Sequence, residues 1–108
     1  MRFIWRALVL TSLLGLSAAH AQTVGDVDKG HIYALQVCAV CHAVDAGDAT
    51  SPNPLSPPFE QLMRQPENSD MTLLIWLHTP HETMPDIKVE SPDLENLFAY
   101  LDTLRPEE

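Results

Sequence analysis

The chain has few of the residues that most metal sites and nucleic-acid surfaces require. It contains two cysteines, four glycines and only six lysines and arginines among 108 residues. A structural zinc site usually needs four Cys or His ligands in two paired half-sites, which two cysteines do not suggest. So few cationic residues argue against binding to nucleic acid or to anionic lipid. No segment alternates apolar and polar residues as a half-buried strand does, so helices are expected.

The N-terminus has the pattern of an export signal. Two arginines precede or flank an apolar run over residues 7–16, and residues 19–21 read Ala-His-Ala, a typical cleavage site. The unbroken apolar run is shorter than the ~20 residues that span a bilayer, although an uncleaved membrane anchor is the alternative. We therefore predict a signal peptide over residues 1–21 and one exported, periplasmic domain over residues 22–108.

The mature domain would be small and strongly acidic. Cleavage of the leader would remove two arginines. The mature chain would then have four Lys and Arg residues and fifteen Asp and Glu residues, a formal net charge of −11. Two interpretations of this charge stay open: a well-solvated surface, or a surface that steers the protein towards a basic partner. A domain of this length buries little surface, so a covalent staple is expected to help it fold.

The segment Cys38-Ala39-Val40-Cys41-His42 carries the strongest chemical signal. It matches C-x-x-C-H, the attachment motif of a c-type haem. Two thiols one helical turn apart can each form a thioether to a haem vinyl group, and the adjacent imidazole is then held as the proximal iron ligand. A thioredoxin-like redox pair would need a βαβ context. A plain disulfide and a chance match are the remaining alternatives.

Three helical segments are expected before residue 80. Residues 27–40 form the first, with Asp26 as its N-cap and with three apolar residues on one stripe: Ile32, Leu35 and Ala39. Residues 59–64 form one turn. Asp70 caps a helix over residues 71–77, which is apolar almost all round, as expected for a helix against a cofactor or in an ordinary core.

The last helix has the clearest boundaries. Ser91 is its expected N-cap, Pro92 takes the first helical position and Pro106 stops the helix. Its apolar residues follow helical spacing: Leu94, Leu97, Phe98, Leu101 and Leu104. The intervening segments, 45–58 with four prolines and 79–89 with two, are predicted to be loops. The fold class is therefore all-α.

Over the whole mature chain, these features resemble the small class I c-type cytochromes of bacteria. The shared order is leader, helix with Gly30, C-x-x-C-H, proline-rich strap, Met84-Pro85 and terminal helix. The resemblance implies a cytochrome c-like fold of three to four short helices wrapped around one haem, with the terminal helices crossing. It also implies that Gly30, eight residues before the first cysteine, lets these two helices touch.

The same resemblance implies that Met84, in a Met-Pro pair before the last helix, is the distal iron ligand. A neutral thioether favours ferrous iron and raises the reduction potential. Met63 and Met71 are the rivals, but both fall in helices, where most methionines fill the core. His78 and His81 could also be considered, although a loop histidine near a haem more often contacts a propionate or solvent.

Residues 56–59, Ser-Pro-Pro-Phe, resemble the family's proline strap. In that strap the proline carbonyl accepts a hydrogen bond from the proximal histidine, so Pro57 would orient His42 and raise its basicity. A purely structural turn is the alternative. Three positions depart from the family pattern: Ala43 replaces the glycine after the motif, Ser56 replaces the small residue before the strap proline, and Ala34 stands where the first helix often has the aromatic residue that contacts the last helix.

With both axial positions of the iron occupied, no site is left for a substrate. We therefore expect a periplasmic electron-transfer protein with one covalent, six-coordinate haem c, which acts as a one-electron carrier and not as an enzyme. Its partners would be redox proteins, with no nucleic acid and no membrane span in the mature form. One alternative is a haem-bearing subunit of a larger periplasmic oxidoreductase. The other, a five-coordinate gas-binding or sensor cytochrome, is disfavoured by Met84-Pro85 and by the early position of C-x-x-C-H.

Overall fold

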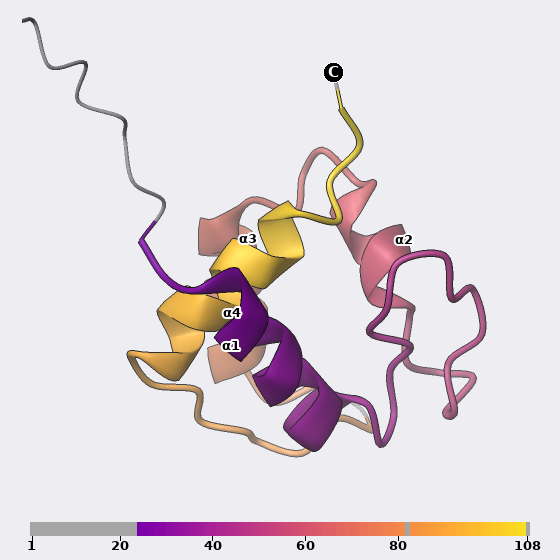
Figure 1. Cartoon of the computed structure of the whole chain (residues 1–108). Helices are drawn as coiled ribbons and strands as arrows, with labels where there is room; N and C mark the ends of the chain where they lie inside the picture. Colours follow the sequence, from indigo (N-terminus) through magenta and orange to yellow (C-terminus); the bar gives the residue numbers. More distant parts are fainter. Residues whose placement is uncertain (1–23, 82, 108) are drawn as a thin grey trace, which may run out of the picture.

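The computed structural model describes residues 24–81 and 83–107, so the predicted signal peptide lies outside the described residues. The regular elements are α1 (Val27–Tyr33), the π-helical turn η1 (Ala34–Cys38), α2 (Phe59–Met63), α3 (Asp70–His78) and α4 (Asp93–Asp102), as Figure 1 shows. The described part of the chain has no strand beyond an isolated bridge between His81 and Met84. The predicted all-α fold is confirmed. None of the described helices is long and apolar enough to cross a membrane.

The N-terminal helix α1 crosses the C-terminal helix α4 at close range (Figure 1). Gly30 makes this approach possible, because a Cβ at that position would lie 1.9 Å from the carbonyl oxygen of Asn96. The side chain of Asn96 also accepts a hydrogen bond from the backbone N–H of Asp26 at 2.8 Å. The predicted helix contact at Gly30 is therefore confirmed.

The apolar stripe predicted for the first helix is wrong at Ile32 and Leu35, and of its three residues only Ala39 packs against the core. Ile32 is 52% exposed and Leu35 is 45% exposed, whereas the buried residues of this stretch are Gly30 and Ala34. These two small residues are four positions apart and therefore share one face of the helix. A face that approaches another backbone closely needs small side chains, and a search for large apolar residues does not find it.

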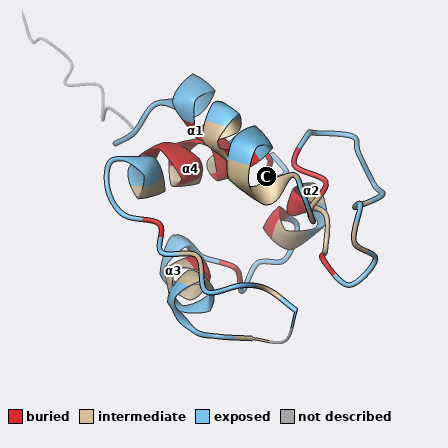
Figure 2. Ribbon diagram, turned by 90° about the horizontal axis from the view of Figure 1, so that it is seen from below, coloured by how far each residue is buried: buried red, intermediate tan, exposed pale blue. Residues whose placement is uncertain are grey.

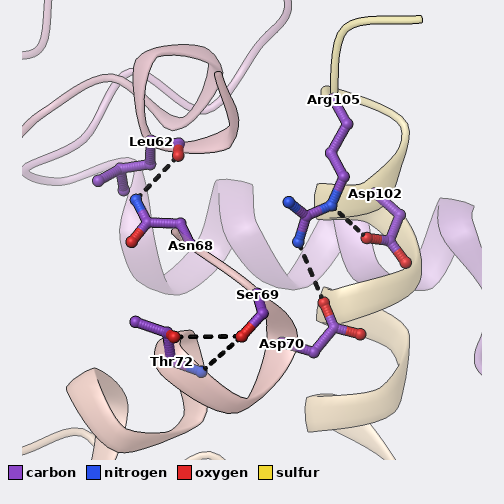
Figure 3. A network of polar contacts seen from close by, with 7 residues as sticks. All are labelled: Leu62, Asn68, Ser69, Asp70, Thr72, Asp102 and Arg105. Carbon is purple, nitrogen blue, oxygen red and sulfur yellow. Dashed lines mark hydrogen bonds and ion pairs between the residues drawn. The ribbon is translucent and has the colours of Figure 1, made fainter. Parts of the chain in front are cut away.

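Helix α3 begins one residue earlier than predicted. Its N-cap is Ser69, whose hydroxyl accepts a hydrogen bond from the N–H of Thr72 at 3.3 Å (Figure 3). Asp70, the predicted cap, instead forms an ion pair with Arg105 at 3.3 Å, and Arg105 also contacts Asp102 (Figure 3). Ser and Asp are almost equally good N-caps, and here they are adjacent in the sequence. Tertiary contacts therefore decide which of the two caps the helix.

The other predicted boundaries are close to those observed. Asp26 caps α1, because its carboxylate accepts a hydrogen bond from the N–H of Lys29 at 3.0 Å. For α4, the predictions for Ser91 and Pro92 are shifted: the helix starts at Asp93, and Pro92 occupies the N-cap position without a side-chain hydrogen bond.

The core is built from one face of α4 and from residues of the shorter helices and loops. Figure 2 shows the buried side of α4, and Leu97, Leu101 and Leu104 of the predicted stripe lie within the core. Helix α3 lies on the opposite side of α4 from α1 (Figure 2). The space between α2, α3, α4 and the loops is where the candidate site lies.

Candidate functional site

A cavity of about 570 Å³ lies beside η1, α2, α3 and α4. This volume is within the range of small-molecule and cofactor sites, roughly 300–1,000 Å³. Its wall is mostly apolar, with contributions from every helix except α1. The same wall includes all five predicted site residues: Cys38, Cys41, His42, Pro57 and Met84. The fold therefore brings together residues that are up to 46 positions apart in the sequence.

The two cysteines are held on one side of the cavity by a turn at the end of η1. The N–H groups of Cys41 and His42 both donate to the carbonyl oxygen of Cys38, at 3.1 and 2.9 Å. Burial raises the pKa of the Cys38 thiol to about 11. A redox-active C-x-x-C pair instead depends on a thiol of lowered pKa, so the environment of Cys38 does not favour that alternative.

His42 is oriented by the proline-rich strap. Its Nδ1 lies 2.7 Å from the carbonyl oxygen of Pro57. A carbonyl can only accept, so the imidazole proton is on Nδ1 and the lone pair is on Nε2. The ring of Phe59 packs against the imidazole, with centroids 5.3 Å apart. The hydrogen bond to Pro57 fixes the tautomer of His42, and together with the packing of Phe59 it fixes the orientation of the ring.

The strap is tied to the motif by three further hydrogen bonds. The N–H of Phe59 donates to the carbonyl of Ala43 at 2.8 Å, and the N–H of Asn53 donates to that of Cys41 at 3.1 Å. The N–H of Ala43 donates to the hydroxyl of Ser51 at 3.0 Å. These bonds hold the segment that contains Pro57 against the C-x-x-C-H turn.

The three methionines of the described residues occupy different environments. Met71 is 65% exposed on the outer surface of α3, and Met63 is only 2% exposed in the core. Met63 and Met84 both line the cavity. Met84 lies in the loop after α3, where its N–H donates to the carbonyl of His81 at 3.3 Å. Thr83, with a φ of 71°, turns the chain just before it.

The two loop-side histidines are separated by the fold. His81 lines the cavity, and its ring meets that of Trp76 edge-on at 5.2 Å. The Nδ1 of His81 lies 2.9 Å from the carbonyl of Thr79. His78 is exposed on α3, where its Nδ1 lies 2.8 Å from the carbonyl of Leu74. Of the two, only His81 lines the cavity.

Tyr100 is a site-supporting residue that sequence reasoning did not assign. Its hydroxyl donates to the carbonyl of Val44, two residues after His42. Its ring stacks on His31 of α1, with centroids 4.6 Å apart and an interplanar angle of 21°, and His31 pairs with Asp45. The aromatic contact between the terminal helices is thus made by His31 and Tyr100. A buried tyrosine needs a hydrogen-bond partner for its hydroxyl, and this need was the one sequence signal for a contact between Tyr100 and another segment.

Two more residues complete the cavity wall. Asn68 is buried, and its side-chain amide donates to the carbonyl of Leu62 at 2.9 Å (Figure 3). Trp76 contributes to the wall and is 52% exposed. Neither could be assigned from spacing alone, because both depend on where α3 packs.

Comparison with known proteins gives one informative match, while no family model and no solved structure matches the chain. The chain is 30% identical over 90 residues to cytochrome c-552 of Bradyrhizobium diazoefficiens. The alignment covers 83% of this chain and 86% of that protein. Identity of this extent along both chains agrees with the helical fold and with the cavity lined by the C-x-x-C-H residues. The chain belongs to the c-type cytochromes, which are electron-transfer proteins that contain haem c.

Proposed function

We propose that the mature protein, residues 22–108, is a periplasmic one-electron carrier of the small class I type. It would hold one covalent haem c with His42 and Met84 as the axial iron ligands, and it would not be an enzyme. The observation that carries this proposal is the apolar cavity whose wall contains both cysteines, His42 and Met84. The export pattern over residues 1–21 supports the periplasmic location, where a c-type haem can be attached.

Cys38 and Cys41 would form the two thioether bonds. In support, both are half-buried on the cavity wall and are free in the structure. Their turn geometry keeps the thiols next to His42, so one rigid segment would supply both covalent anchors and the proximal ligand. When bound, haem c supplies an iron that gains or loses one electron.

His42 would bind iron through Nε2. The supporting contact is between Nδ1 and the carbonyl of Pro57, which leaves the lone pair of Nε2 free to coordinate. A ligating histidine typically donates its other N–H to a carbonyl or carboxylate, which orients the ring and raises its basicity. Pro57 would thereby take the role that the resemblance implied.

Met84 is preferred over the other methionines as the distal ligand. Met71 is on the outer surface, and Met63 is packed in the core cluster of α2 and α4. Met84 borders the cavity from a loop, so its thioether can move onto the iron without disturbing a helix. With both axial positions filled and an apolar wall around them, electron exchange would need little rearrangement and no bound substrate.

Mass spectrometry and optical spectroscopy of the periplasmic protein test the proposal. The intact mass should equal the polypeptide 22–108 plus one haem, and the oxidised spectrum should contain the weak near-infrared band of methionine–iron ligation. A polypeptide without haem, with Cys38 and Cys41 in a disulfide, would contradict the attachment. Binding of carbon monoxide by the native ferrous protein would contradict six-coordination and would favour a gas-binding cytochrome.

A further inference from the structure

Helix α3 is apolar on the side that faces solvent as well as on the side that faces the cavity. Leu73, Trp76 and Leu77 line the cavity, whereas Met71 is 65% exposed and Ile75 is 58% exposed. Met71 and Ile75 are four residues apart and are therefore neighbours on the helix surface. Large apolar side chains that gather on the surface of a soluble protein mark interaction sites. We call Met71, Ile75 and Trp76 the α3 face.

The hydrogen bonds and ion pairs drawn in Figure 3 hold the N-terminal end of α3. Ser69 caps the helix, Asn68 bonds to α2 through Leu62, and Asp70 pairs with Arg105. These contacts leave the outer side of α3 open along its length (Figure 2). Leu73 and Leu77 also pack the inner side of the helix into the core, so the face is presented on a fixed helix and offers a defined surface to a partner.

Trp76 connects this face to the cavity. Its side chain lines the cavity and is 52% exposed, and the ring of His81 meets it edge-on at 5.2 Å. A partner that covers Ile75 would also meet the adjacent Trp76, which belongs to the cavity wall.

The charges around the α3 face indicate what kind of partner fits. Glu67 is exposed before its N-terminal end and Asp86 is exposed in the loop beside the cavity, whereas Asp70 is paired with Arg105. Arg105 is already paired with carboxylates of this chain, and Lys88 is the one exposed cation in that loop. An acidic rim around an apolar centre complements a surface with apolar residues ringed by Lys and Arg. A second copy of this chain, with its formal net charge of −9 over the full sequence, would be repelled.

We propose that the α3 face is the docking surface for a one-electron redox protein whose own contact surface is apolar and ringed by Lys and Arg, with Trp76 as the contact nearest the haem. This inference rests on the proposed electron-carrier function. In each encounter the iron of this protein loses or gains one electron and the redox centre of the partner gains or loses one. No bond is formed or broken, and no proton is transferred.

The test uses the holoprotein and two small oxidants as probes. Tris(phenanthroline)cobalt(III) is cationic with apolar rings, as the proposed partner is, whereas hexacyanoferrate(III) is a polar anion. Stopped-flow oxidation of the ferrous protein is measured for Ile75→Lys and for its matched control Ile32→Lys, which changes the same residue at 52% exposure on the other side of α4. Both variants change the net charge equally, so any difference between them reports the place of the substitution.

Ile75→Lys should lower the rate constant with the cobalt probe by about tenfold, and Ile32→Lys should lower it by less than about twofold. Neither variant should slow oxidation by hexacyanoferrate(III). Intact mass, optical spectrum and reduction potential should remain those of the wild type, since neither residue lines the cavity. Loss of haem in the wild type would refute the proposed function and not the docking surface.

Equal rates for the two variants with the cobalt probe would overturn the docking proposal. A dimer in sedimentation-velocity experiments that Ile75→Lys dissociates and Ile32→Lys does not would also overturn it, because the α3 face would then serve a second copy of this chain. A tenfold loss confined to Ile75→Lys, with a monomeric wild type, would support it.

Discussion

The Nδ1 atom of His42 lies 2.7 Å from the carbonyl oxygen of Pro57, fifteen residues further along the chain. The strap that carries Pro57 is bonded to the motif on both sides, through Asn53 and Phe59. The orientation of the imidazole therefore depends on a loop whose conformation is restricted by proline. This dependence leads to the first prediction.

Pro57→Gly should loosen the strap while it keeps the backbone carbonyl. The change increases the conformational entropy of the unfolded chain, so the free energy of unfolding should fall by about 1 kcal/mol. A weaker hydrogen bond to Nδ1 makes the imidazole less basic and so stabilises ferric iron less. The reduction potential should therefore rise, which a redox titration measures. Pro54→Gly, in the same loop, is the control that should lower stability without a change in potential.

Gly30→Ala should disrupt the crossing of α1 and α4. The added Cβ would lie 1.9 Å from the carbonyl oxygen of Asn96, and that atom belongs to a helix backbone that cannot move alone. The free energy of unfolding should fall by about 3 kcal/mol or more. Gly47→Ala is the control, since its Cβ would meet nothing within 4 Å and only its φ of 79° is unfavourable. Equal losses in urea unfolding would show that the crossing tolerates a side chain.

Tyr100→Phe should remove the hydrogen bond to Val44 and leave a buried carbonyl without its donor. The free energy of unfolding at neutral pH should fall by about 1–3 kcal/mol. Burial, and secondarily the charge of Asp45, raise the pKa of Tyr100 above its usual value of 10.0. Its contribution to stability is thus complete below pH 10 and is lost as the pH rises through the higher pKa of the folded state.

Urea unfolding at neutral pH and above pH 10 measures this effect. The wild type should lose stability over that interval, and Tyr100→Phe should lose less of it. Because the pKa of Tyr33 is also raised, chiefly by burial, Tyr33→Phe is the matched control. If Tyr100→Phe loses as much stability above pH 10 as the wild type does, the loss is due to other ionisable groups.

Local signals located most helices because caps, prolines and helical spacing act within a few residues. Asp26 and the apolar residues of α4 were found in this way. The inner face of α1 was not found, since it consists of Gly30 and Ala34 and is defined only by the approach of α4. The N-cap of α3 was missed for a similar reason, because Asp70 is drawn to Arg105 by a contact 35 residues away in sequence.

The candidate site likewise contains residues that local sequence predicts and residues that it does not. The C-x-x-C-H residues are adjacent, so their chemistry could be read from the sequence. Met84 and Pro57 could be predicted only through the family resemblance, because both lie in loops whose approach to the cavity depends on long-range packing. The place of Trp76 on the cavity wall was only partly predicted, because a helix that is apolar almost all round fits a cofactor site and an ordinary core equally well. Long-range packing, and not residue chemistry, is what the sequence left open.

The last prediction is that Met84 is the distal ligand. Met84→Ala should keep the haem attached through both cysteines and His42 but should abolish the near-infrared methionine band. The freed iron should become high-spin or bind water or His81, which also lines the cavity. The reduction potential should fall, because a thioether ligand favours ferrous iron.

The other two methionines provide matched controls with different expected costs. Met63 is 2% exposed, so Met63→Ala should lower the free energy of unfolding by about 2–5 kcal/mol and leave the band in place. Met71 is 65% exposed, so Met71→Ala should change stability by less than about 0.5 kcal/mol. The decisive contrast is between Met84 and Met63, because both border the cavity. If Met63→Ala abolishes the band and Met84→Ala keeps it, the ligand comes from α2. The loop around Thr83 would then have a structural role in closing the cavity and no direct role at the iron.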